Sequence, residues 1–400
     1  MNKKRTFLST LTLAALVICL LFGGSLLLLN VSNSSDNLKT RADTRTVTNG
    51  DLMTAAEDFN DDPIHIKGNF SEWTNGSGTA GDPYFISDLR INASSGDYGI
   101  KIEHTDDYFV IENVTVTSVV SSEVSGFHLD NVTNGELRNN NANENGFGFR
   151  VEDSENNNLT GNFAEENAGG FMVTNSTNNT LRSNIADDNN EFLSDNEGVG
   201  FSIEKSTDNV LDDNTATNNG EWGFSLSKSE NNELTENTAN NNTNGFIFAE
   251  SHNNNLNKNT ANENTADGIF LGECDNNTIT DNTVNKNEGD GILLGNSSDN
   301  TITDNTANEN TGYGISLTLY SNYNTVTGNT LRYNEDGCIE EDLCEGNDID
   351  DNVCEKKEED ENGENGFEIS GYNILMIHSS ILVISAILLT TRKKTTNHLV

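Results

Sequence analysis

The chain has 400 residues, a formal net charge of -42 and only 2 prolines. Such an acidic surface repels nucleic acid and anionic lipid, which excludes nucleic acid as a partner. With 33% hydrophobic residues, the composition lies close to that of disordered chains, but a regular repeat in the central region excludes disorder there.

The N-terminal region has the pattern of an export signal. Residues 1–30 begin with Lys3, Lys4 and Arg5 and continue with an apolar run from Phe7 to Leu29. This pattern predicts a secretory signal peptide or an uncleaved signal anchor. We interpret residues 31–62 as a linker and residues 63–97 as the N-terminal cap of a solenoid.

Residues 98–354 contain a repeat in which glycine is followed by Phe or Ile. Successive glycines lie 22 or 23 residues apart, except for one step of 30. The pairs are Gly126-Phe127, Gly148-Phe149, Gly170-Phe171, Gly200-Phe201, Gly223-Phe224, Gly245-Phe246, Gly268-Ile269, Gly291-Ile292 and Gly314-Ile315. We assign Gly337-Cys338 to the same pair, one further step of 23. A fixed period of this length indicates a solenoid, because the blades of a β-propeller need about 40 residues each.

Other residues repeat in phase with this pair. Leu or Ile stands ten positions after the Phe or Ile, as at Leu137 and Leu256, and Ala stands five positions later, as at Ala142 and Ala261. Three columns of Asn and one of Ser run beside them. Short apolar runs between Asn, Asp, Thr and Gly favour three strands per repeat, with identical side chains stacked about 4.8 Å apart. We predict an all-β fold, a parallel β-helix of about eleven coils.

These columns resemble the NosD-type β-helix repeat family, also called the carbohydrate-binding and sugar-hydrolysis repeat. The match is strongest over residues 276–287 and 300–317. Residues 63–69 are similar to the segment that opens such domains in archaeal cell-surface proteins. The resemblance implies a right-handed parallel β-helix. It implies no single activity, because the family includes transport-associated periplasmic proteins, polysaccharide-active proteins and cell-surface proteins.

The family name suggests copper, which prefers clustered His, Cys or Met. The histidines of the repeat region and its cap are scattered, at His65, His104, His128 and His252. We therefore expect no copper site and no resident cofactor, with Ca²⁺ as a candidate ion.

Carboxylates provide the candidate cation or ligand sites. One group stands two residues after the Leu/Ile column, with Lys258 in the same column: Asp213, Glu236, Asp281 and Asp304. A second group surrounds the 30-residue step: Asp187, Asp188, Asp195 and Glu197. Stacked carboxylates would share a cation or raise one another's pKa. The alternative is a solvated face and an insertion tolerated at a turn.

Aromatic residues are the candidates for stacking against a sugar. They are Trp222, Tyr313, Tyr320, Tyr323 and Tyr333, and the four tyrosines crowd the last full coils. The alternative for this cluster is a hydrophobic cap.

Three cysteines lie close together in the last coil. We place Cys338 in the Phe/Ile column, Cys344 in the Ser column and Cys354 in the Ala column. Outside the cell, a disulfide among them would staple the open end of the solenoid, and the sequence leaves the pairing open. Metal binding by the three thiolates is the alternative.

The C-terminal region has the pattern of a membrane anchor. Residues 355–368 form an acidic tether, and residues 369–394 contain an apolar run followed by Arg392, Lys393 and Lys394. About 20 apolar residues suffice to cross a bilayer. The basic cluster should stay cytoplasmic, which places the solenoid on the extracellular face. Asn-x-Ser/Thr sequons in that region are candidate glycan acceptors.

We therefore expect a membrane-anchored extracellular β-helix that binds polysaccharide or glycan, or mediates cell-surface adhesion, without catalysis. One alternative is a calcium-assisted polysaccharide lyase or a glycoside hydrolase on the same scaffold. The other is a structural component of a surface layer. An enzyme should bring carboxylates and a Lys or Arg together, whereas a binder should show an exposed aromatic strip.

Overall fold

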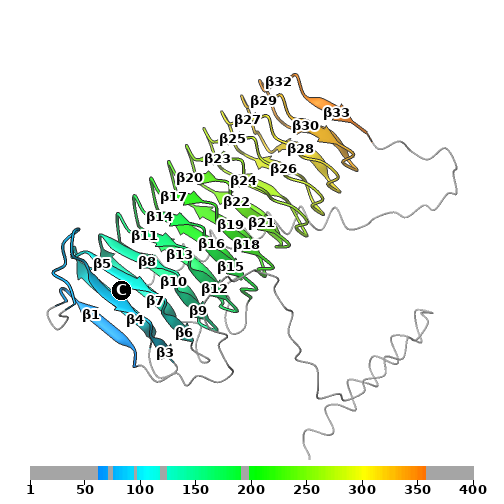
Figure 1. The fold of residues 1–400 in the computed structure, drawn as a ribbon. Coiled ribbons are helices and arrows are strands. Elements are labelled where there is room, and N and C mark those ends of the chain that lie inside the picture. The colour runs from blue at the N-terminus through cyan, green and yellow to red at the C-terminus, as the bar shows by residue number, and fades with distance from the viewer. Residues whose placement is uncertain (1–61, 71–74, 94–96, 118–123, 191–197, 357–400) are drawn as a thin grey trace, which may run out of the picture. The chain divides into compact units, whose positions relative to one another are not determined.

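A computed structural model describes residues 62–70, 75–93, 97–117, 124–190 and 198–356 (Figure 1). The expected signal segment, membrane helix and nearly all of the linker and tether lie outside these residues. Within them, we find no helix with the length and apolar character needed to cross a bilayer.

The described secondary structure consists of β-strands that form two long sheets and two shorter ones. The first long sheet contains, in spatial order, β1 (Ile64–Lys67), β4 (Tyr98–Thr105), β7 (Ser125–Val132), β10 (Phe147–Glu152), β13 (Gly169–Thr174), β16 (Val199–Glu204), β19 (Trp222–Ser227), β22 (Asn244–Ala249), β24 (Ile269–Gly272), β26 (Ile292–Gly295), β28 (Tyr313–Thr318) and β31 (Gly337–Asp342). The second contains β2 (Tyr84–Ser87), β5 (Phe109–Glu112), β8 (Gly135–Arg138), β11 (Asn158–Thr160), β14 (Thr180–Arg182), β17 (Val210–Asp212), β20 (Glu233–Thr235), β23 (Asn255–Asn257), β25 (Thr278–Thr280), β27 (Thr301–Thr303), β29 (Thr325–Thr327) and β32 (Asp348–Asp350).

The third side of each coil is shorter. Its seven-stranded sheet contains β3 (Arg90–Asn92), β6 (Thr115–Thr117), β9 (Asn141–Asn143), β12 (Phe163–Glu165), β15 (Ile185–Asp187), β18 (Thr215–Thr217) and β21 (Thr238–Asn240), and a two-stranded sheet contains β30 (Thr330–Arg332) and β33 (Val353–Glu355). Single bridges between stacked threonines connect the two, from Thr238 through Thr260, Thr283 and Thr306 to Thr330.

All strand pairs within the sheets are parallel, and each coil adds one strand to each long sheet. Figure 1 shows the coils stacked in chain order, from β1 to β32 and β33. Twelve strands in each long sheet confirm the predicted parallel β-helix of about eleven coils. The short apolar runs form strands because each buries its inward side chains only against the coils above and below.

The core consists of stacked columns. From Phe127 to Phe246, six phenylalanine rings stack with centroids 4.7 to 4.8 Å apart. The glycine column faces the alanine column across the inside of the same coil. A Cβ on Gly148 would lie 2.8 Å from the Cβ of Ala164 and 2.7 Å from the backbone oxygen of Gly170. Glycine recurs because no side chain fits between these atoms.

Buried Asn ladders close the corners of the coils. Asn259 is representative, because its Oδ1 accepts both the backbone N–H and the side-chain amide of Asn237, at 3.0 Å each. Its own amide donates to the backbone oxygen of Leu234 at 2.8 Å. Each Asn therefore satisfies turn groups that would otherwise be buried without partners.

The structure corrects one position in the predicted repeat. Ile339 pairs with Ile315, so Ile339 and not Cys338 occupies the Phe/Ile column. The strand partner of Tyr313 is Gly337, which places Cys338 in the glycine column. The shift arises because the connection between β28 and β29 contains one extra residue, so Ile302 pairs with Val326, 24 positions later.

Candidate functional site

The candidate functional site is a group of charged side chains on the outer side of β1, β4, β7 and β10, which we call the charged face. Residues alternate in these strands, so Phe127 and Leu129 point into the core whereas His128 lies on the outer side between them. Parallel register aligns two outward columns. The first is His65, Lys101, His128 and Arg150, and the second is Lys67, Glu103, Asp130 and Glu152.

Glu103 is the most buried acid of the charged face, with 7% of its side chain exposed. Lys101 Nζ lies 2.6 Å and Lys67 Nζ 2.8 Å from its carboxylate oxygens. Hydrogen bonds from these two lysines lower the pKa of Glu103 to about 2. Lys101 also contacts Asp130 at 3.2 Å. Burial lowers the pKa of Lys101, but its hydrogen bonds to the two carboxylates outweigh burial and raise it overall.

His128 is the least solvated base of the charged face. Burial lowers its pKa, and the charges of Arg150 and Lys101 on either side lower it further. Its imidazole is therefore neutral at neutral pH. Nε2 lies 3.4 Å from Glu152 Oε2. Within the part of the chain that the structure describes, this nitrogen and Arg150 Nε are buried atoms without a hydrogen-bond partner.

Arg150 completes the charged face at β10. Its Nη2 lies 3.1 Å from Glu152 Oε2, and its guanidinium lies 5.9 Å from the centre of the Phe147 ring. The arrangement combines cations that can bind a carboxylate, carboxylates that can accept from hydroxyl groups, and a neutral imidazole that can accept a proton.

The sequence contains a signal for this face that lies outside the predicted metal ligands. Each member of the first column directly follows an inward apolar residue of the first sheet, as His128 follows Phe127 and Arg150 follows Phe149. Histidines that are scattered in the sequence are thus aligned with Lys and Arg by the register of the coils.

The predicted acidic column lies elsewhere, along one turn. Its members, Asp213, Glu236, Asp281 and Asp304, are all exposed and adopt positive φ values of 55° to 57°. Lys258 shares this conformation. Among the described residues, these acids do not gather into a group of three that could hold an ion.

A compact acidic cluster does form beside the long step of the repeat. Glu165, Asp187 and Asp188 each place a carboxylate oxygen within 4.8 Å of the others. Burial, and then the charges of neighbouring acids, raise the pKa of Glu165. Thr217 and Asn218 donate to Asp187 Oδ1 at 2.6 and 3.0 Å.

The prediction named two members of this cluster and missed Glu165, which comes from the preceding coil. The other predicted acids of this region, Asp195 and Glu197, lie outside the described residues. Oxygen-only ligands suit Ca²⁺ rather than copper.

The candidate stacking residues do not form a single strip. Tyr320 and Tyr323 are 63% and 60% exposed and lie between β28 and β29. Tyr333 is 42% exposed, lies after β30 and donates to Glu355 Oε2 at 3.0 Å. Trp222 and Tyr313 are half-buried in the first sheet.

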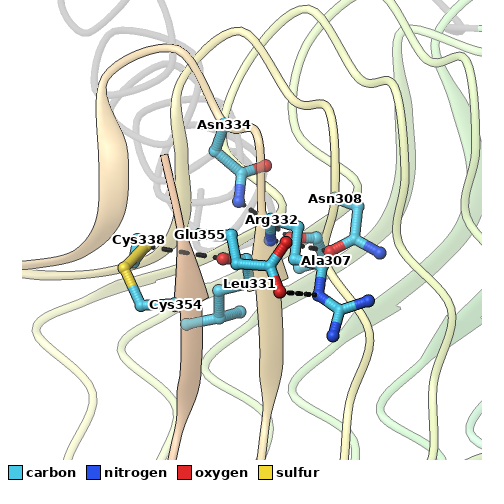
Figure 2. Close-up of a disulfide and its surroundings, with 8 residues drawn as sticks. All are labelled: Ala307, Asn308, Leu331, Arg332, Asn334, Cys338, Cys354 and Glu355. Carbon is cyan, nitrogen blue, oxygen red and sulfur yellow. Dashed lines mark hydrogen bonds and ion pairs between the residues drawn. A yellow bond between two sulfur atoms is a disulfide. The ribbon is translucent and has the colours of Figure 1, made fainter. Parts of the chain in front are cut away.

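The last coil contains one disulfide, between Cys338 and Cys354, whose Cα atoms are 5.8 Å apart (Figure 2). Cys338 occupies the glycine column, and Cys354 pairs with Leu331 in the alanine column. The glycine and alanine columns face each other inside the coils. In the last coil, the two facing positions are occupied by cysteines that form a disulfide. Cys344 remains a half-buried free thiol.

Copper does not fit the described residues. His104 Nδ1 lies 3.0 Å from the amide of Asn131, and His252 Nδ1 accepts the N–H of Asp275 at 3.0 Å. His128 lies beside Glu152 as well as Lys101 and Arg150, and the other histidine of the charged face lies two strands away, on β1. The one described group that could hold a metal contains carboxylates alone.

Solved structures with this architecture come from several kinds of protein. The Dettilon tailspike protein gp208 is 15% identical, with a TM-score of 0.53, and the match covers 70% of this chain and 60% of that one. The A-module of the Azotobacter vinelandii mannuronan C-5 epimerase AlgE6 is also 15% identical, with a TM-score of 0.42 and coverage of 69% and 89%. The Streptococcus pneumoniae surface adhesin PfbA is 10% identical, with a TM-score of 0.33 and coverage of 66% and 86%.

At these identities the likeness concerns the fold alone. No curated protein matches the chain in sequence. Residues 66–244 and 194–342 both match the family model described as periplasmic copper-binding protein (NosD), and together they span more than half of the chain. The chain therefore belongs to the NosD family.

Proposed function

We propose that the protein is an exported β-helix, held to the extracellular side of a membrane by residues 369–394, that binds polysaccharide on its charged face. The observation that carries the proposal is the convergence of Lys101, His128 and Arg150 with three carboxylates on neighbouring strands. A flat sheet with repeated polar groups suits an extended polymer with repeated hydroxyl and carboxylate groups. Sugar carboxylates would pair with the cations, and hydroxyl groups with Asp130 and Glu152.

The charge distribution supports an acidic polysaccharide as the ligand class. The chain carries 64 acidic residues, yet Lys and Arg balance the acids on the charged face. A polyanion would be repelled elsewhere and accepted here. Calcium held by Glu165, Asp187 and Asp188 is a proposed second contact for the same ligand.

The test is binding of the purified protein to a panel of neutral and uronate-containing polysaccharides, with and without Ca²⁺. Arg150→Gln should weaken binding to the uronate polymers about tenfold, the loss of about 1.4 kcal/mol of contact energy. Lys228→Gln is the matched control, because Lys228 makes a long 3.7 Å ion pair with Glu250 away from the charged face. Unchanged binding by Arg150→Gln would overturn this site. Absence of any binding or turnover would favour a structural role.

The neutral imidazole of His128 favours a second candidate, a polysaccharide lyase. A neutral His between two cations can take the proton from the carbon that bears the sugar carboxylate, and Lys101 and Arg150 would stabilise the charge that develops there. A carbon–carbon double bond then forms as the neighbouring glycosidic carbon–oxygen bond breaks, and the leaving oxygen takes a proton from water or from the protonated His128. Incubation with uronate polymers would then yield shorter chains with unsaturated ends. His128→Gln should abolish the product while binding persists, and absence of product from the wild-type protein would eliminate this candidate.

A further inference from the structure

The last described coil leaves an apolar end. In the coil before it, the inward residues Ile315, Val326 and Leu331 are 0% exposed. Their stacked partners Ile339 and Ile349 are only partly buried, and Cys354 is exposed. A hollow of about 530 Å³ lies over this end, and its lining includes Ile339, Ile349, the two bridged cysteines and Lys356. An uncovered apolar end with open strand edges invites pairing with another segment.

The chain contains a segment that matches the missing coil. Residues 362–370 have the sequence NGENGFEIS, and residues 219–227 have the sequence NGEWGFSLS, identical at six of nine positions. In the second stretch, which includes β19, Asn219 belongs to a buried ladder and Gly223 to the glycine column. Phe224 and Leu226 point into the core. Residues 362–370 thus repeat the residues that a first-sheet strand needs.

We propose that residues 362–370 dock on β31 as a further strand and close the end of the β-helix, so that the membrane-spanning run proposed above begins after Ser370. Gly366 would pair with Cys338, and Phe367 would stack on Ile339. Asn362 would accept from Asn334, as Asn334 Oδ1 accepts the backbone N–H and the amide of Asn310 at 2.9 and 3.0 Å. The aromatic ring of Phe367 would cover the hollow, as phenylalanine rings fill this column from Phe127 to Phe246.

The connection has the length that this docking needs. Nine residues, 356–364, separate β33 from Asn365, which corresponds to Trp222 at the start of β19. Elsewhere in the same molecule, eleven residues separate β15 from β16, and β16 still pairs in register with β13 of the coil before it. The disulfide ties β33 to β31 and so fixes where the connection begins. A covalently attached segment also has a high effective concentration, which favours it over a second copy of the chain.

Hydrogen exchange of the full chain tests the docking. In the other coils, the N–H of the Phe/Ile column donates to the glycine of the next coil, as Ile269 does to Gly291 at 2.9 Å. The amide of Ile339 should therefore donate to Gly366. We expect the amides of residues 337–342 to exchange at least about tenfold more slowly in the wild-type chain than in Phe367→Asp. Phe367→Leu should restore protection, and Glu359→Gln should leave it unchanged.

Two results would overturn the proposal. One is equal exchange of residues 337–342 in the wild-type chain and in Phe367→Asp. The other is protection that rises with protein concentration and ignores Phe367, because that outcome identifies a second copy of the chain as the partner of this end.

Discussion

The carboxylates of Asp267, which is buried, and Asp290, which is half-buried, make the stability of the β-helix depend on pH. Asp267 Oδ1 accepts the backbone N–H of Asp290 at 2.8 Å, and Asp290 Oδ1 accepts that of Tyr313 at 2.6 Å. Burial raises the pKa of Asp267 to about 6. Burial, and then the charge of Asp267, raise that of Asp290 to about 8. Each carboxylate oxygen accepts a backbone N–H from the next coil, and so links two coils at a position where a negative charge is unfavourable.

The sign of the effect follows from the direction of these shifts. The unfolded chain releases these protons near the ordinary pKa of 3.8, whereas the folded chain retains them to about 6 and about 8. Between pH 4 and pH 8 the folded state therefore binds more protons, and the free energy of unfolding falls as pH rises. Each extra proton corresponds to about 1.4 kcal/mol per pH unit. For Asp290 alone, the upper bound at pH 8 is about 6 kcal/mol.

Asp290→Asn isolates this contribution. The amide oxygen can still accept the N–H of Tyr313, but the group no longer titrates. Urea unfolding from pH 4 to pH 8 should show a shallower loss of stability in the variant, and a gain over wild type of several kcal/mol at pH 8. Asp281→Asn, at an exposed turn, is the matched control and should retain the wild-type slope. Parallel slopes for wild type and Asp290→Asn would refute the reasoning.

Three further predictions concern the packing of the coils. Gly170→Ala should lower the free energy of unfolding by about 1 to 3 kcal/mol, because its Cβ would lie 2.9 Å from that of Ala186. The control in thermal unfolding is Gly81→Ala, whose Cβ meets nothing within 4 Å. Equal unfolding midpoints for the two variants would contradict the prediction. Asn259→Ala should lower the free energy of unfolding by about 2 to 3 kcal/mol, since it removes the acceptor of Asn237 and the donor to Leu234. A loss below about 0.5 kcal/mol in urea unfolding would contradict this prediction. Cys354→Ser should lower the free energy of unfolding by about 3 kcal/mol, because it opens a disulfide loop of 16 residues, whereas Cys344→Ser removes a free thiol and should leave the stability unchanged. A wild-type unfolding midpoint that reductant does not change would argue against this prediction.

The inward columns of the core could be predicted because stacking demands the same residue at the same place in each coil. Phe127, Leu137 and Ala142 each head such a column, and the structure buries all three. The assignment of Cys338 was wrong because one extra residue near Tyr320 shifts the phase by one, and a count of glycines cannot detect it. The shift matters because it places Cys338 in the glycine column, opposite Cys354, and not in the Phe/Ile column.

The outward columns could not be predicted in the same way, since no packing constraint repeats them. Lys101, His128 and Arg150 differ in type and become a group only through the register of β4, β7 and β10. The acidic cluster shows the same limit. Asp187 and Asp188 are adjacent in sequence, whereas Glu165 joins them only through the pairing of β12 with β15.

Other coils of the same fold lack the charged face, and this supports the proposal that the face is a binding site. In β16 and β19 the same outward position is occupied by Ser202 and Ser225, and those coils stack in the same register. Partly exposed ion pairs contribute about 0 to 1 kcal/mol each, little beside the buried columns. Glu103, with 7% of its side chain exposed, carries a desolvation cost, but the two lysines that lower its pKa to about 2 outweigh that cost. Because other coils stack in the same register without these charges, their concentration on β4, β7 and β10 supports the proposal that this face binds a ligand.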